Sequence, residues 1–171
     1  MSPVTARYHL AQVNVARPRA PLDSPTLAEF MAELDPINAL ADTAPGFVWR
    51  LQTEDGNATA IRVLGDENLM INLSVWESLE ALGAFVHDSR HRDVMRRRRE
   101  WFVRLAEAYL ALWWVPAGHH PTVSEAEARL LHLRSHGPTP VAFTMRSHFP
   151  SPDGEAPTAG WPADRWTCPT A

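Results

Sequence analysis

The chain has 171 residues, of which 45% are apolar and 21% charged, and its formal net charge is −4. This composition predicts one globular domain, and the negative charge argues against nucleic acid as a partner. The single cysteine, Cys168, excludes an internal disulfide and a thiolate metal site, and the absence of lysine excludes a Schiff-base lysine.

Four elements are predicted in the first third of the chain. Residues 9–16 alternate between apolar and polar, which indicates a strand with either a bulge or burial on both faces. Residues 17–25 contain three prolines and are expected to form a loop. Residues 26–40 space apolar side chains three and four apart, which predicts a helix that Pro36 kinks or restarts. Residues 47–52 have the composition of a short strand.

The middle of the chain contains the clearest strand and a long helical region. Residues 61–64 begin an extended piece, and residues 69–76 form a strand that places alternate side chains on opposite faces. One face carries Met70, Asn72, Ser74 and Trp76. Residues 78–108 have helical periodicity, with a break expected at the polar stretch near Asp88 and Ser89. Residues 110–115 form the last strand of this series.

This strand-helix-strand-strand-helix-strand order predicts a ferredoxin-like α+β domain, with an antiparallel sheet and both helices on one face. The strands carry several tryptophans, namely Trp49, Trp76, Trp113 and Trp114. A bare sheet face with such side chains would aggregate. We therefore expect a homodimer that packs sheet on sheet.

A helix-strand appendage is predicted after Pro116. Thr122 and Glu125 fit a capping box, in which Thr122 is the N-cap and Glu125 reaches back. The helix ends at Gly137, and residues 141–145 form a strand. We thus expect one domain over residues 1–146, with a core at 8–115, the appendage at 116–146 and a Pro-rich tail at 147–171.

The polar interruption of the second helical region offers candidate chemistry. His87 and His91 are four residues apart and share a face on an unbroken helix. Because no third ligand is fixed nearby, a single histidine acting as acid, base or haem ligand is favoured over a metal site, and solvated or capping histidines are favoured over both. The arginines at 92 and 96–99 form a solvated face, or one of them binds a substrate carboxylate or phenolate. His119 is expected to hydrogen-bond to Glu125.

Two stretches of the sequence resemble known proteins. The predicted order, with Ser-Val-Trp-Glu-Ser at 74–78 leading into the second helix, resembles the dimeric α/β-barrel superfamily, which includes antibiotic-biosynthesis and haem-degrading monooxygenases. The run Trp-Trp-Val-Pro-Ala-Gly-His at 113–119, the helix after it, Gly-Pro-Thr at 137–139 and Phe143 resemble a bacterial family of unknown function within that group. The resemblance covers about residues 8–146.

The resemblance also implies site residues. Haem-degrading relatives use an asparagine on the first strand, which Asn14 matches, and a tryptophan and a haem-ligating histidine in the second helix. Phe85 and Met95 stand at those two positions, so haem degradation of that type is not expected. His91, one helical turn before Met95, could reach the same cleft.

Three hypotheses follow. The first is a cytoplasmic enzyme of small-molecule metabolism, for example in secondary-metabolite biosynthesis, that needs no cofactor and acts as a monooxygenase, cyclase or isomerase on an apolar or aromatic substrate. Asn14 would polarise the substrate oxygen and His91 or His87 would move protons. The pocket would be lined by Trp49, Trp76, Phe85, Arg92, Met95 and Trp113. The second is a haem-binding protein with His91 as the ligand, and the third a non-enzymatic dimeric binding module. No apolar run is long enough to span a membrane.

Overall fold

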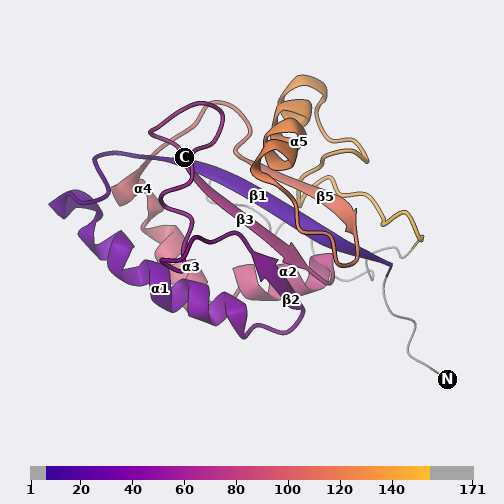
Figure 1. Cartoon of the computed structure of the whole chain (residues 1–171), viewed down its shortest axis with the longest axis horizontal. Helices are drawn as coiled ribbons and strands as arrows, with labels where there is room; N and C mark the ends of the chain where they lie inside the picture. The colour runs from indigo at the N-terminus through magenta and orange to yellow at the C-terminus, as the bar shows by residue number, and fades with distance from the viewer. Residues whose placement is uncertain (1–6, 155–171) are drawn as a thin grey trace.

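The computed structural model describes residues 7–154, and its centre is an antiparallel five-stranded sheet (Figure 1). The central strand, β1 (Tyr8–Pro18), pairs with β3 (Met70–Trp76) on one side and with β5 (Leu110–Pro116) on the other. β2 (Phe47–Arg50) pairs with the outer edge of β3, and β4 (Phe102–Val103) pairs with the end of β1. The order β2-β3-β1-β5 is that of a ferredoxin-like domain, so the predicted fold class is confirmed.

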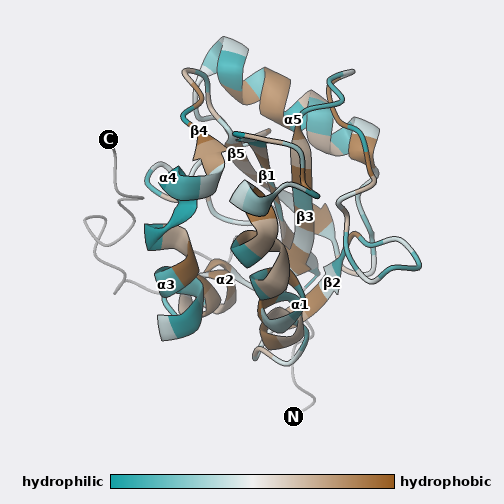
Figure 2. Cartoon of the chain, turned by 90° about the vertical axis from the view of Figure 1, so that its left-hand side faces the viewer, coloured by the Kyte–Doolittle hydropathy of each residue, from teal (hydrophilic) through white to brown (hydrophobic). Residues whose placement is uncertain are grey.

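Helices cover both faces of this sheet. The short 3₁₀ turn η1 (Pro25–Leu27) leads into α1 (Ala28–Asp42), which lies on the same face as α2 (Leu79–Val86), α3 (Ser89–Arg96) and α4 (Arg98–Trp101). α5 (Val123–His136) lies on the opposite face (Figures 1 and 2). α1 continues through Pro36 without a restart.

The second helical region is broken where the sequence predicts, and it ends earlier than predicted. The hydroxyl of Ser78 accepts a hydrogen bond from the N–H of Ala81 at the start of α2, and Asp88 caps α3 in the same way. The prediction that the helix runs to residue 108 is wrong. Phe102 is extended and pairs with Pro18, because the free edge of β1 supplies backbone partners to the chain that follows α4.

Three smaller predictions also need correction. Residues 61–64 belong to the loop between β2 and β3, where the only ladder contact is a bridge from Val63 to Asp66. Residues 141–145 form no strand and pair with β5 only through Phe143. The predicted loop at 17–25 begins two residues late, because β1 extends to Pro18. The described start of the tail, residues 147–154, packs on β5 through the Phe149 carbonyl, which accepts from the Trp114 indole at 2.9 Å; the remainder of the predicted tail lies outside the described residues.

The sheet face opposite α1–α4 is covered within the chain. It buries Val13, Val15, Leu73 and Trp113 in one cluster with Ala126, Leu130 and Leu133 of α5 and with Val63 and Leu69 of the β2–β3 loop. Leu64 donates its backbone N–H to the Glu127 carboxylate at 2.7 Å, which ties that loop to α5. The sheet therefore needs no second copy to cover this face, and the homodimer stays a prediction from the sequence.

The predicted capping box is half confirmed. Thr122 accepts a hydrogen bond from the N–H of Glu125, as expected of an N-cap. The Glu125 side chain does not reach back to the N-cap, because it accepts a hydrogen bond from the indole of the fully buried Trp113 at 3.1 Å. Its other oxygen lies 2.7 Å from His119, so the expected His119–Glu125 contact is confirmed. Among the described residues, no helix is both long and apolar enough to cross a membrane.

Two neighbouring leucines of α5 test whether this helix is part of the core. The side chain of Leu130 is fully buried, whereas Leu131 is 47% exposed. We expect Leu130→Ala to lower the free energy of unfolding by about 2–5 kcal/mol, because it leaves a cavity between α5 and the sheet. Leu131→Ala should lower it by less than about 1 kcal/mol. Urea unfolding followed by circular dichroism measures both, and equal losses would contradict the packing described here.

Candidate functional site

A cavity of about 250 Å³ lies between the sheet and α1, α2 and α3. Its floor is the helix-side face of β1 and β3, where side chains at alternate positions point towards the helices. The pairing register places these side chains in rows across the two strands. From one end to the other, the rows are Ala16 with Met70, Asn14 with Asn72, Gln12 with Ser74, and Leu10 with Trp76. Successive rows are about 7 Å apart along the strands.

The two central rows are polar. Asn72 of one row is exposed, whereas the Gln12–Ser74 row is buried, which is unusual for polar side chains on a sheet face covered by helices. Gln12 and Ser74 are each only 6% exposed. They are joined by a chain of hydrogen bonds that runs along the floor. The Trp76 indole donates to Ser74 Oγ at 3.0 Å, Ser74 Oγ donates to Gln12 Oε1 at 2.9 Å, and Gln12 Nε2 donates to Asn14 Oδ1 at 2.9 Å. Both buried polar side chains, Gln12 and Ser74, thus have hydrogen-bond partners.

The chain starts at Trp76. An indole N–H can only donate, so Ser74 accepts from it, and the Ser74 hydroxyl donates in turn to the carbonyl oxygen of Gln12. The Gln12 amide nitrogen then donates to the carbonyl oxygen of Asn14. The result is that Asn14 presents its two amide N–H groups, rather than its oxygen, to the rest of the cavity. A donor in that position can bind a carbonyl oxygen or an oxyanion.

His91 lies above this floor, on α3. Its Nδ1 is 3.2 Å from the carbonyl oxygen of Val86, and its ring packs against Phe85 at a centroid distance of 4.9 Å. Because a carbonyl only accepts, Nδ1 carries the proton and Nε2 is left with a lone pair. Burial lowers the pKa of His91 below its ordinary value of 6.5, against smaller opposing effects of the Val86 carbonyl and the Asp88 carboxylate. His91 is therefore a neutral base at pH 7.

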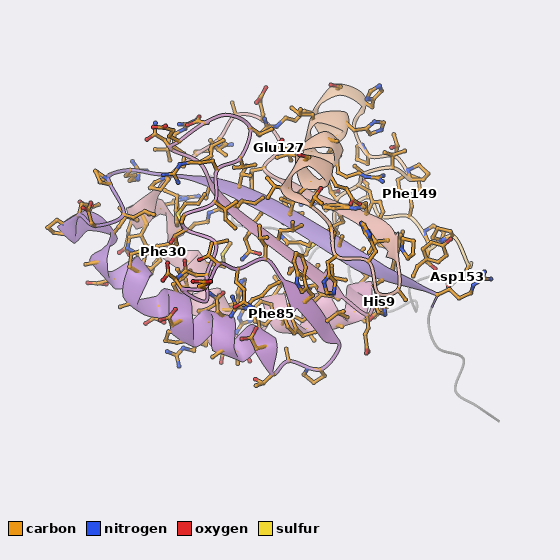
Figure 3. All side chains as sticks on the ribbon, viewed as in Figure 1. His9, Phe30, Phe85, Glu127, Phe149 and Asp153 are labelled. Atoms are coloured by element: carbon orange, nitrogen blue, oxygen red, sulfur yellow. The ribbon has the colours of Figure 1, made fainter. Side chains whose placement is uncertain are left out.

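Aromatic rings form one end of the cavity. The Phe85 ring stacks on Trp76 with centroids 5.1 Å apart and planes 28° apart, and Phe47 meets Trp76 edge to face at 5.4 Å. Phe30 of α1 and Phe85 both lie on the side of the sheet away from Glu127 and α5 (Figure 3). Further apolar side chains of the lining are Leu34, Ile37, Val94 and Met95. The cavity is thus apolar at its walls and polar at the centre of its floor, as in many small-molecule sites.

The structure brings together five of the nine site residues that the sequence predicts. They are Asn14, Trp76, Phe85, His91 and Met95, all in the cavity lining. The other four lie outside the cavity lining. His87 is the C-cap of α2, so the break in the helix separates it from His91. Trp49 stacks on His120 at 4.8 Å, Trp113 lies beneath α5, and Arg92 is exposed on α3.

Two functional residues of the floor were not predicted. Gln12 and Ser74 connect Trp76 to Asn14, and both stand at alternate positions of predicted strands, where an apolar residue would be expected beneath helices. That departure from the apolar pattern is the signal by which they could have been found. No group of three or more His, Cys, Asp or Glu side chains suited to a metal ion occurs within residues 7–154.

Comparisons with known proteins identify a family and a set of similar folds. The family model described as "Domain of unknown function (DUF3291)" matches residues 9–159. None of the curated proteins compared with the chain matches it.

Similar solved structures share little sequence with the chain. They include Rv0793 from Mycobacterium tuberculosis, with 13% identity and a TM-score of 0.43, over 67% of this chain and 99% of that one. The cofactor-independent oxygenase SnoaB from Streptomyces nogalater has 16% identity and a TM-score of 0.44, over 67% and 97%. PA3566 from Pseudomonas aeruginosa has 12% identity and a TM-score of 0.44, over 67% and 98%. The fold assignment rests on the strand order of the chain itself.

The protonation of His91 can be measured directly. In a proton NMR titration, the His91 ring should titrate below pH 6.5, because its cation is disfavoured by burial. The resonance that disappears in His91→Gln identifies it. Between the lowered pKa and 6.5 the unfolded chain binds more protons than the folded one, so His91 makes stability fall as pH is lowered through 6.5. A His91 pKa at or above 6.5 would contradict the buried, neutral base.

Proposed function

The chain belongs to the DUF3291 family, and we propose that this member is an enzyme that deprotonates a small aromatic or apolar metabolite and stabilises the resulting oxyanion. The observation that carries the proposal is the pairing of two groups in one cavity. Asn14 presents amide donors at the end of the hydrogen-bond chain that starts at the Trp76 indole, and His91 presents a neutral Nε2. A fixed donor and an unprotonated base beside an aromatic wall are what enolisation or phenol ionisation requires.

The reaction begins with the substrate oxygen hydrogen-bonded to Asn14. His91 Nε2 removes the proton from the adjacent carbon or hydroxyl, and the negative charge develops on the oxygen that Asn14 holds. The lining of Phe85, Trp76 and α1 places apolar surface beside the anion and orients its ring. The chain of hydrogen bonds through Ser74 and Gln12 keeps Asn14 in its donor orientation without reorganisation.

In the oxygenase form of this proposal, the carbanion transfers its electrons to molecular oxygen. The carbon–oxygen bond forms, the proton from the His91 imidazolium goes to the peroxide, and loss of water leaves a new carbonyl group. An activated CH₂ and O₂ thus give C=O and H₂O, so the substrate itself is the reductant and no cofactor is needed. A cyclase or isomerase would share the first step and return the proton to another atom. A tailoring step in biosynthesis suits such an activity.

Anthrone is a suitable first substrate, because its CH₂ group lies between two aryl rings and ionises through the neighbouring carbonyl. We expect anthraquinone to form only when oxygen is present, and its absorbance measures the rate of the reaction. Asn14→Ala should lower kcat/KM by about 10²–10³, the effect of removing one oxyanion donor. His91→Gln should lower it by about 10²–10⁴, the contribution of a positioned base.

Matched controls lie outside the cavity. Asn68 and His136 are exposed, and their changes Asn68→Ala and His136→Gln should leave kcat/KM within about twofold. Turnover that is equal in Asn14→Ala, His91→Gln and these controls would contradict the named site. Tight binding of aromatic compounds with no turnover would favour the non-enzymatic binding module.

The orientation of His91 also favours a second candidate, haem binding, because an imidazole whose Nδ1 donates to a carbonyl offers Nε2 to a metal. The cavity of about 250 Å³ is below the usual range for ligand pockets, roughly 300–1,000 Å³, and favours a compound of a few fused rings. We therefore expect no Soret shift when haemin is titrated into the protein. A Soret band that is lost in His91→Ala would establish haem binding and displace the first proposal.

A further inference from the structure

The four consecutive arginines at 96–99 have four different environments. Arg96 pairs with Asp93 at 3.2 Å, and Arg97 pairs with both Glu29 and Glu100. Arg99 is exposed and contacts Arg19 only through its backbone carbonyl. Arg98 alone among the four lines the cavity. Arg98 is the first residue of α4, directly after the break between α3 and α4.

Arg98 is held in place by a neutral group. Its guanidinium lies 4.8 Å from the centroid of the Tyr109 ring, and Nη1 donates to the Tyr109 hydroxyl at 3.3 Å. Within residues 7–154, no carboxylate lies within ion-pair distance of Arg98. The guanidinium is half-buried, so its charge is less screened than that of a surface arginine. It keeps its positive charge and donors that Tyr109 does not use.

The other charged residues of the lining are already compensated. Arg50 donates hydrogen bonds to both oxygens of Asp42, at 2.7 and 3.1 Å, and to the carbonyl of Gly56. Glu33 lies 3.6 Å from Arg90. His91 is neutral because burial lowers its pKa. Among the described residues that line the cavity, Arg98 is therefore the charged side chain that has no oppositely charged partner.

The position of Arg98 relative to the floor follows from the strand register. Tyr109, on which Arg98 stacks, directly precedes Leu110, and Leu110 is the β5 partner of Asn14. The backbone carbonyl of Tyr109 also accepts a hydrogen bond from the N–H of Val15, next to Asn14. Arg98 thus lies at the Asn14 end of the floor, whereas the stacked rings of Trp76 and Phe85 lie two rows away, about 13 Å along the strand.

We propose that Arg98 binds a carboxylate of the substrate, so that the metabolite is an aromatic acid with its ring system towards Trp76 and Phe85. This inference rests on the proposed function, because it assigns a substrate class to the same cavity. The planar guanidinium matches a carboxylate with two parallel hydrogen bonds. Arg98 is then a specificity-determining residue that selects anionic over neutral ring compounds.

Two probes of equal shape and different charge test the proposal, namely 2-naphthoate and 2-naphthamide. Isothermal titration calorimetry at about 0.1 M salt should show naphthoate binding about 10- to 100-fold more tightly than naphthamide, the effect of a charge-assisted bond. In Arg98→Gln this preference should vanish, with naphthamide affinity unchanged within about threefold, which also shows that the variant is folded. Arg98→Lys should keep part of the preference for naphthoate, because lysine retains the positive charge but not the paired donors of the planar guanidinium.

Arg99→Gln is the matched control, since Arg99 is the next residue and lies outside the cavity lining; it should keep the full preference. Preference that survives in Arg98→Gln, or that is absent from the wild-type protein, overturns the inference. If naphthamide still binds and shifts the His91 resonance, the proposed site stands while the carboxylate site fails. If neither probe binds at millimolar concentration, the carboxylate site fails, while anthrone turnover still decides the proposed function.

Discussion

A single buried N–H group organises the site. The Trp76 indole is 1% exposed and has one donor, which must find an acceptor on the sheet because an unmet buried donor costs about 1–3 kcal/mol. Ser74 accepts this hydrogen bond, and the hydrogen-bond chain continues from Ser74 to Gln12 and from Gln12 to Asn14. Asn14 therefore lies at the end of a hydrogen-bond chain that starts on the neighbouring strand, at a side chain that also forms the aromatic wall.

The two faces of the sheet divide stability and function between them. The face beneath α5 is apolar throughout its central rows, and it buries Val13, Val15, Leu73 and Trp113 without a polar interruption. That face can supply most of the hydrophobic stabilisation, in proportion to the area it removes from water. The opposite face can then tolerate two polar rows and a cavity beneath α1–α3, both of which reduce packing. A sheet without α5 would lack the stabilisation that offsets this loss of packing.

The sequence predicts the fold and the two faces of β3 well, because both depend on alternation along strands. The face shared by Asn72, Ser74 and Trp76 follows from position alone. The end of the second helical region could not be predicted, since Phe102 leaves the helix to use the free edge of β1, a partner distant in sequence. The same applies to Trp113 and Trp49, because local pattern does not say which side α5 will cover. Arg92 and Arg98 belong to the same arginine-rich stretch, and Arg98, which lines the cavity, follows a break between α3 and α4 that the sequence did not predict.

The β2–β3 loop contacts both the cavity on one face of the sheet and α5 on the other face. Its residues Asn57, Ala58 and Thr59 line the cavity, while Leu64 is bonded to Glu127 of α5 on the other side of the sheet. Ordering this long loop costs conformational entropy, and the contact with α5 has already met part of that cost before any ligand arrives. We therefore expect docking of α5 and occupation of the cavity to be coupled with a positive sign, although no side chain of α5 lines the cavity. By reciprocity, a compound that fills the cavity should also strengthen the attachment of the appendage, a thermodynamic link through the sheet between the site and a helix it never touches.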